Sequence, residues 1–274
     1  MTRTIAITGA AGSIGRKLRA HFEGRGDCSL RLLDSDAGGD PAVIEADLAR
    51  WDESWVETFA QADAVIHLAG DPRPDAPWGS VVRSNVDLVL NVFEAAVRQK
   101  AGRLIFASSN WTMAGHRFAG GELGTGREPA PVNAYGVSKL MGERIGRSFS
   151  ERHGLSVVCF RIGYCQQEPG NRPGPHMGWN RWGQEMWLSD RDLCSAFELA
   201  VDAPQELRFE VLNLMSQNQG MRWDIESTKR VLGWQPQDGW APELTDAMRA
   251  DEEAARKARA VIEHTEALLA DRRW

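Results

Sequence analysis

Tyr135 and Lys139, four residues apart in "YGVSK", are residue types that can move a proton together. On a helix, side chains at i and i+4 share one face, so the phenol and the ammonium point toward one ligand. A free tyrosine has a pKa of ~10 and is a poor base at neutral pH, but a nearby positive charge stabilises the phenolate. Ser109 ends the apolar run "GRLIFASS" and can hydrogen-bond the same reacting oxygen. These three residues predict general base catalysis on a hydroxyl group.

Three glycines near the start of the chain predict a phosphate site. Gly9, Gly12 and Gly15 in "TGAAGSIG" stand between an apolar run and a helical pattern, where a pyrophosphate can rest on the helix N-terminus. Tight turns also use glycine, but here an acidic residue, Asp34, ends the next apolar run. A carboxylate there accepts hydrogen bonds from a ribose 2′-hydroxyl and repels a 2′-phosphate, which favours NAD over NADP. The alternative is that Asp34 merely caps a loop. A separate prediction places the side chain of Asp47, in "EADL", at the adenine edge.

The elements that must position these residues alternate between two patterns. Strands are predicted over 2–8, 29–34, 63–70, 102–109 and 155–163, and helices over 13–26, 55–61, 81–100 and 134–154. Apolar strands separated by helices are typical of a parallel sheet covered by helices on both faces. The sequence therefore predicts an α/β fold, a Rossmann-type doubly wound sheet with a small C-terminal substrate-binding portion.

Three regions are expected along the chain. Residues 1–163 would form the dinucleotide-binding core with Ser109, Tyr135 and Lys139, and 164–241 the substrate-binding loop region with the last core elements. Residues 242–274 are helix-forming and charged, which predicts a helical tail, either a solvated helix or a subunit contact.

Composition excludes several classes of function. The chain has 274 residues, 42% hydrophobic and 26% charged, and a net charge of −6, so neither nucleic-acid nor membrane-surface binding is expected. No signal peptide or spanning segment is indicated, and the four cysteines form no CxxC pair and no metal-like spacing. We therefore expect a cytoplasmic protein with reduced thiols and no metal.

The motifs "TGAAGSIG", "HLAG", "FASSN" and "YGVSK", in this order, resemble the extended short-chain dehydrogenase/reductase family, which includes sugar epimerases and dehydratases. The likeness covers roughly residues 3 to 165. It implies a Ser109, Tyr135 and Lys139 catalytic triad, with Lys139 also holding the nicotinamide ribose. The cofactor-binding residues that it implies are Gly9, Gly12, Ser13, Ile14, Gly15, Asp34, Asp47, Leu48, Leu68, Ala69, Gly70, Tyr135 and Lys139.

Within that family the chain is most similar to uronate dehydrogenases, which oxidise the anomeric carbon of a hexuronate to a lactone with NAD. The signatures are "RIG.C..EP.N" at 161–171 and "WD......LGW.P.D" at 223–238. The resemblance also implies that Asn110 helps to place the sugar. The short chain argues against a large nucleotide-sugar substrate.

Departures from that pattern predict a rebuilt substrate pocket. Trp111 replaces a histidine and Tyr164 a small residue. The loop that follows is longer and contains Arg172, His176, Trp179, Arg181, Trp182 and Trp187. Arginines suit bidentate binding of an oxyanion, so Arg172 or Arg181 is predicted to contact a substrate anion, and Arg73 to approach the same pocket. Ordinary packing of the tryptophans and a surface position for either arginine stay open.

The predicted function is NAD-dependent oxidation of the C1 hydroxyl of an acidic aldose, a hexuronate first. A sulfonated aldose such as sulfoquinovose is the alternative, followed by a phosphorylated or neutral aldose. A nucleotide-sugar epimerase or dehydratase would instead retain tightly bound NAD and show no net reduction. A non-catalytic NAD sensor is disfavoured by the Tyr–Lys pair. Nothing in the sequence positively supports a scaffold that uses the helical tail. A homo-oligomer is expected, with no partner besides the small-molecule sugar.

Overall fold

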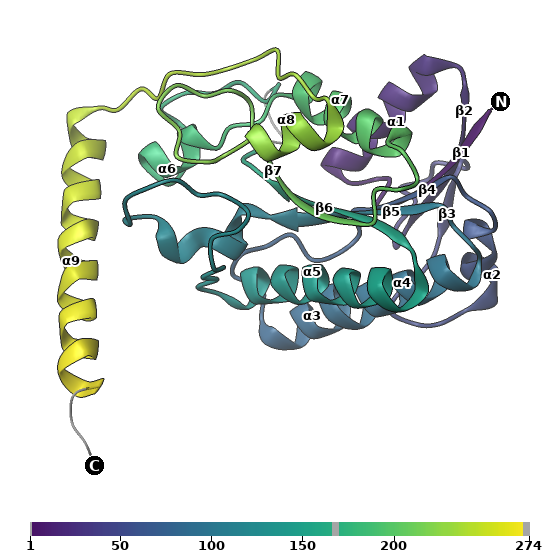
Figure 1. The fold of residues 1–274 in the computed structure, drawn as a ribbon, viewed down its shortest axis with the longest axis horizontal. Helices are drawn as coiled ribbons and strands as arrows, with labels where there is room; N and C mark the ends of the chain where they lie inside the picture. The colour runs from purple at the N-terminus through teal and green to yellow at the C-terminus, as the bar shows by residue number, and fades with distance from the viewer. Residues whose placement is uncertain (1, 166–169, 271–274) are drawn as a thin grey trace.

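A seven-stranded parallel sheet forms the centre of the molecule, in the order β3-β2-β1-β4-β5-β6-β7 (Figure 1). The computed structural model describes residues 2–165 and 170–270. The strands are β1 (Arg3–Thr8), β2 (Cys28–Asp34), β3 (Val43–Glu45), β4 (Ala64–His67), β5 (Arg103–Ser109), β6 (Ser156–Ile162) and β7 (Phe209–Leu214). This is the strand order of a dinucleotide-binding sheet, which confirms the predicted α/β class.

Helices cover both faces of the sheet (Figure 1). One face carries α1 (Ser13–Arg25), α7 (Asp190–Asp202) and α8 (Glu226–Leu232), and the other carries α3 (Trp78–Val82), α4 (Leu88–Arg98) and α5 (Ala134–His153). The remaining helical segments are α2 (Glu53–Val56), α6 (Asn180–Glu185), α9 (Asp246–Ala270), the 3₁₀ turns Glu57–Phe59 and Asn110–His116, and a π-helical turn at Arg83–Asp87. Between helix layers the central strands lie in a dry environment, so their sequences read as continuous apolar runs.

Burial on both faces explains why the strands were readable from sequence. Every residue of β5 and β6 is buried, and apolar side chains on the two faces belong to two separate core clusters. The two strands pair in register from Arg103 opposite Ser156 to Ser109 opposite Ile162. That register sets Ser109 at the carboxyl edge of the sheet, where ligands bind in such folds.

The C-terminal part contains order that periodicity did not reveal. Strand β7 and helices α6, α7 and α8 were not among the predicted elements. The predicted helical tail corresponds to α9, which stands at one end of the molecule and reaches past its body (Figure 1).

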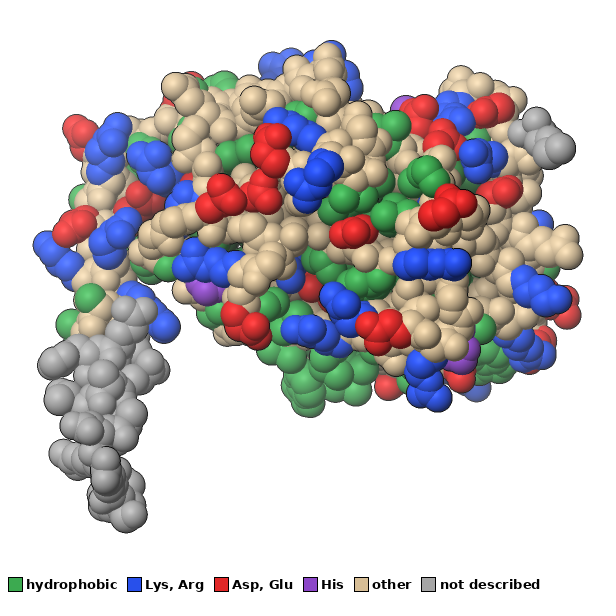
Figure 2. All heavy atoms as spheres, viewed as in Figure 1, with side chains coloured by type: hydrophobic (Ala, Val, Ile, Leu, Met, Phe, Trp, Pro, Cys, Tyr) green, Lys and Arg blue, Asp and Glu red, His purple; other side chains and the backbone are tan. Residues whose placement is uncertain are grey.

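Charge is spread evenly over the face in view. Figure 2 shows Lys and Arg side chains interspersed with Asp and Glu side chains, with no broad field of one sign. Within the described ranges no helix is long and apolar enough to cross a membrane.

Candidate active site

A cleft of about 1140 Å³ lies at the carboxyl ends of the central strands. All thirteen residues that the sequence assigned to the cofactor line this cleft, together with Ser109. They come from the β1–α1 turn, the ends of β2 and β4, the segment after β3, and helix α5. A dinucleotide is long and needs such an extended, continuous groove.

The glycine turn has the shape that a pyrophosphate requires. Gly9 has a φ of +73°, and a Cβ there would lie 2.7 Å from the backbone nitrogen of Ala69. A Cβ on Gly15 would lie 2.2 Å from the carbonyl oxygen of Gly9, so the turn and the first helical residues pack without side chains between them. Helix α1 begins after Gly12 with no side-chain cap, which leaves its N-terminal N–H groups to bind an anion. These observations fit a dinucleotide at this site.

Asp34 and Asp47 hold different positions in the cleft. One carboxylate oxygen of Asp34, Oδ2, accepts a hydrogen bond from the Ala11 backbone at 2.9 Å, which fixes the side chain beside the glycine turn. Its Oδ1 is oriented by weaker contacts with the following loop and remains available to a ribose hydroxyl. Asp47 is exposed, accepts a hydrogen bond from the Ala49 backbone and forms an ion pair with Arg83.

Ser109, Tyr135 and Lys139 line the same cleft. Ser109 is the last residue of β5, and its Oγ accepts a hydrogen bond from the Trp111 backbone at 3.2 Å. Tyr135 lies in the first turn of α5, which Asn133 caps by accepting from the Gly136 backbone at 2.7 Å. The Lys139 ammonium is buried 5.6 Å from the Tyr135 ring centroid, as the i, i+4 spacing predicted.

Burial shifts the pKa values of both Tyr135 and Lys139. It raises the pKa of Tyr135 to about 12, against which a hydrogen bond with Ser109 acts, while the Asp71 carboxylate adds to the rise. It lowers the pKa of Lys139 to about 8. A cation beside the phenol is therefore needed to lower the pKa of Tyr135 toward the neutral range.

A buried ion pair anchors α5, the helix that carries Tyr135 and Lys139, and its residues were not among those predicted from sequence. Glu143, on α5 one turn beyond Lys139, receives two hydrogen bonds of 2.9 Å from the Arg161 guanidinium and one of 2.6 Å from Ser108 Oγ. Both charged side chains are at most 4% exposed. The ion pair ties α5 to β5 and β6 next to Ser109, and the i+4 spacing from Lys139 is the one signal that could have revealed it.

A second cavity of about 400 Å³ adjoins the cleft and shares Asn110, Trp111 and Tyr164 with it. Trp179 and Trp182 also line it, and the Trp111 and Trp179 rings meet edge to face at 5.3 Å. Several residues predicted to contact substrate, because they differ from the uronate dehydrogenase pattern, line this cavity. Its volume is at the small end of the range for ligand pockets, ~300–1,000 Å³.

Two of the three arginines predicted from sequence to contact the substrate lie outside both cavities. Arg172 and Arg181 are exposed, and neither is among the described residues that line the two cavities. Arg73 does line the larger cleft, where it pairs with Asp71 at 2.7 Å. The guanidinium groups in the smaller cavity belong to Arg117 and Arg259, which the sequence analysis did not single out. They come from distant parts of the chain, and no local pattern marks them.

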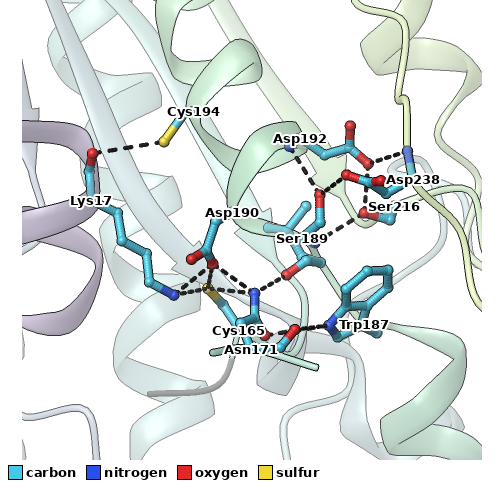
Figure 3. Close-up of polar contacts among 11 residues, drawn as sticks. Lys17, Cys165, Asn171, Trp187, Ser189, Asp190, Asp192, Cys194, Ser216 and Asp238 are labelled. Atoms are coloured by element: carbon cyan, nitrogen blue, oxygen red, sulfur yellow. Dashed lines mark hydrogen bonds and ion pairs between the residues drawn. The ribbon is translucent and has the colours of Figure 1, made fainter. Parts of the chain in front are cut away.

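The signature residues at 161–171 and 223–238 are largely structural. Lys17 Nζ lies 2.7 Å from Asp190 and 3.4 Å from Cys165 Sγ, and Asn171 donates to the same Asp190 oxygen, so α1, α7 and the loop are joined beside the cleft (Figure 3). The "EP" of this motif lies outside the described residues. Buried Asp192 accepts hydrogen bonds from Ser216 Oγ and from the backbone of 237 and 238. Trp187, Trp223 and Trp234 are buried, and for Trp187 this agrees with the packing interpretation.

Comparison with known proteins agrees with this geometry. Residues 5–165 match the model of the NAD dependent epimerase/dehydratase family. The chain is 35% identical to the NAD-dependent glucose-6-phosphate dehydrogenase of Haloferax volcanii over 88% of this chain and 95% of that protein. It is 32% identical to an L-arabinose 1-dehydrogenase (NAD(P)(+)) of the same organism, over 86% of this chain and 97% of that protein.

A solved structure shows the same arrangement. A mutant uronate dehydrogenase from Agrobacterium tumefaciens, crystallised in complex with NAD, superposes with a TM-score of 0.72 at 29% identity. The match covers 87% of this chain and 86% of that one. The resemblance drawn from the sequence motifs is therefore confirmed, both in family and in fold.

Proposed function

Because the chain belongs to the NAD-dependent epimerase/dehydratase family and is an NAD-dependent sugar oxidoreductase, we propose that it oxidises the C1 (anomeric) hydroxyl of an acidic aldose to the lactone. The observation that carries the proposal is the junction of the two cavities. The cofactor cleft, which Tyr135 also lines, and the smaller pocket meet at Asn110, Trp111 and Tyr164. Asn110 and Trp111 directly follow Ser109 in the chain, and Tyr164 follows β6. A sugar in the pocket would thus present one ring carbon to the Ser–Tyr pair.

The side chains of the site have complementary roles. Tyr135, as the phenolate, takes the proton of the C1 hydroxyl, and Ser109 donates a hydrogen bond to that oxygen. The Lys139 ammonium stabilises the phenolate. Bound NAD⁺ supplies the acceptor for the hydride that leaves C1, so the alcohol becomes the lactone carbonyl. Trp111 and Tyr164 shape the pocket around the ring, and Asn110, whose amide donates to the Ile162 carbonyl at 3.0 Å, is held rigidly beside it.

Different residues of the cleft would bind different parts of the cofactor. The backbone from Gly9 to Gly15 would hold the pyrophosphate, and Asp34 the adenosine ribose. Asp47 and Leu48 would lie near adenine, the backbone of 68–70 would follow the cofactor, and Lys139 would bind the nicotinamide ribose.

The related enzymes are named for different sugars, so they do not identify the acidic group of the substrate. One related enzyme is named for a uronate, one for glucose 6-phosphate and one for the neutral sugar arabinose. A hexuronate remains our first candidate. A phosphorylated aldose is the second, because the glucose-6-phosphate dehydrogenase matches nearly end to end.

A screen of aldoses tests this proposal. Purified enzyme is mixed with NAD⁺ and, in turn, glucuronate, galacturonate, sulfoquinovose, glucose 6-phosphate and glucose, and NADH formation is followed by absorbance. We expect stoichiometric NADH with an acidic aldose and a lactone as the first product by NMR. Tightly retained NAD with no net reduction on any free sugar would instead identify an epimerase or dehydratase.

A further inference from the structure

Arg117 occupies an unusual position in the smaller cavity. It follows the 3₁₀ turn Asn110–His116 that begins at the end of β5, and its backbone N–H donates to the Ala114 carbonyl at 3.1 Å. Its side chain lines the cavity beside Trp111, one of the residues shared with the cofactor cleft. The catalytic strand therefore leads directly into the wall of the pocket that carries this cation.

Two aromatic rings hold the guanidinium. Its carbon lies 4.8 Å from the ring centroid of Phe118 and 5.1 Å from that of Trp179. Such contacts stabilise the cation and occupy its faces, so hydrogen bonding is left to its edge. Trp179 stands at the start of α6 and Phe118 next to Arg117, and both line the same cavity.

The side-chain N–H groups of Arg117 donate no assigned hydrogen bond in the described part of the chain. Arg117 Nε is buried and has no hydrogen-bond partner, and in the described part of the chain no acceptor is assigned to the other nitrogens. Buried donors are almost always paired, so an orphaned one on a cavity wall indicates a ligand. Burial also lowers the pKa of Arg117, against which Glu252 and Asp251 of α9 act.

Neighbouring charges do not take this role. Arg222 donates to Glu185 at 2.6 Å and to the Ala119 carbonyl at 2.7 Å, so its guanidinium is committed to the fold. Asp251 accepts from Asn180 and Glu252 from the Arg181 backbone, so both carboxylates are engaged with the start of α6.

We propose that Arg117 is the residue that binds the anionic group of the sugar, with Nε and a neighbouring guanidinium nitrogen donating to two oxygens of one carboxylate, phosphate or sulfonate. The inference rests on the proposed function, because it gives the acidic aldose its binding partner. Paired oxygens match the fork of an arginine, and the walls formed by Phe118 and Trp179 keep water from competing. Arg117 lines the smaller cavity and not the cofactor cleft, so an anion bound to it would lie in the sugar pocket.

The test compares three variants with the wild type. Arg117→Gln removes the cation, and Arg117→Lys keeps a charge without the fork. Arg98→Gln is the matched control, because Arg98 also stacks on an indole, that of Trp51 at 5.6 Å, but on the exposed surface of α4. We expect Arg117→Gln to lower kcat/KM for the preferred acidic aldose at least about 100-fold and to leave kcat/KM for glucose within about threefold. Lysine should restore part of the loss, and Arg98→Gln should change neither value.

The aldoses also distinguish the anions, since the wild type's preference among glucuronate, glucose 6-phosphate and sulfoquinovose identifies the group that Arg117 receives. Equal losses on acidic and neutral sugars, or none on either, would overturn the assignment while leaving the dehydrogenase function intact. The same holds if Arg172→Gln or Arg181→Gln, and not Arg117→Gln, shows the selective loss.

A binding measurement separates the two proposals if no aldose is oxidised. Titration of the enzyme with sodium glucuronate, and separately with inorganic phosphate, is followed by tryptophan fluorescence, because Trp111 and Trp179 adjoin the site. We expect a change that saturates in the wild type and is weakened at least about tenfold in Arg117→Gln. An equal Kd in both proteins contradicts the assignment, with thermal unfolding confirming that the variant is folded.

Discussion

At the scale of single residues, the site depends on a tyrosine whose environment opposes its ionisation. Burial and the Asp71 carboxylate both raise the pKa of Tyr135, and Lys139, whose own pKa is lowered to about 8, is the adjacent protein cation. We therefore expect the phenolate to form only when the ammonium and the positive charge of the oxidised cofactor act together.

Replacement of the base tests this arrangement. Tyr135→Phe removes one oxygen and keeps the ring packed beside Lys139, so turnover should be abolished while NAD⁺ binding is largely retained. Steady-state rates and calorimetric titration with NAD⁺ measure the two properties. A variant that keeps more than a few per cent of wild-type kcat would show that another group is the base.

We expect one side chain, Asp34, to decide cofactor choice. Asp34 is fixed beside the glycine turn, where its carboxylate would repel a 2′-phosphate, and no arginine follows it directly in "DSDAGG". We expect kcat/KM for NAD to exceed that for NADP by at least roughly tenfold, about 1.4 kcal/mol. Asp34→Ala should narrow the ratio, and equal values in the wild type would refute this role.

At the scale of elements, the catalytic helix is held by the buried pair of Glu143 and Arg161. Three hydrogen bonds to one carboxylate fix both the height and the rotation of α5 against β5 and β6. Tyr135 and Lys139 lie on the same helix, so their positions relative to Ser109 depend on this anchor.

Removing one charge of this ion pair should destabilise the folded protein. Glu143→Gln leaves the Arg161 guanidinium buried without its partner, which should lower the free energy of unfolding by ~3–5 kcal/mol. Glu151→Gln on the same helix is the control, because its ion pair with Arg147 is exposed and 3.7 Å long, and such pairs contribute ~0–1 kcal/mol. Urea denaturation measures both variants, and similar losses would show that the buried pair has no special role.

At the scale of the whole molecule, a buried histidine couples folding to pH. His67, at the end of β4, is fully buried, with Nδ1 2.7 Å from Thr8 Oγ1 and Nε2 without a partner. Burial, with a smaller effect of Lys139, lowers the pKa of His67 to about 3. The unfolded chain titrates near ~6.5, so it binds more protons than the folded protein between these two values.

Stability should therefore fall as the pH is lowered from about 6.5 toward 3. The contribution of His67 approaches about 1.4 kcal/mol per pH unit and is fully present above the unfolded pKa. Denaturation between pH 7 and pH 5, above most carboxyl titrations, should show this slope in the wild type and a shallower one in His67→Gln. The slope is compared rather than the absolute stability, since the substitution also alters packing; identical slopes would contradict the prediction.

The sequence alone was sufficient for the dinucleotide fold and for the residues lining its cleft. The glycine turn, Asp34 at the end of β2, and the Tyr135–Lys139 spacing follow from one strand, one turn or one helix, whose geometry local sequence encodes. Apolar strands buried on both faces gave equally local signals, whereas the order of the strands in the sheet comes from the structure. The roles of the lining residues stay predictions.

Tertiary structure decided which side chains line the smaller cavity, the proposed sugar pocket. Its walls come from the segment after β5, from Tyr164, from α6 and from Arg259 on α9, which meet only when the sheet and its C-terminal additions have packed. A single arginine in such a segment carries no periodic or spacing signal, so sequence favoured Arg172 and Arg181 in the Arg- and Trp-rich loop. Packing instead exposes those two and brings Arg117 between Phe118 and Trp179, because long-range contacts rather than chain proximity determine which side chains share a cavity.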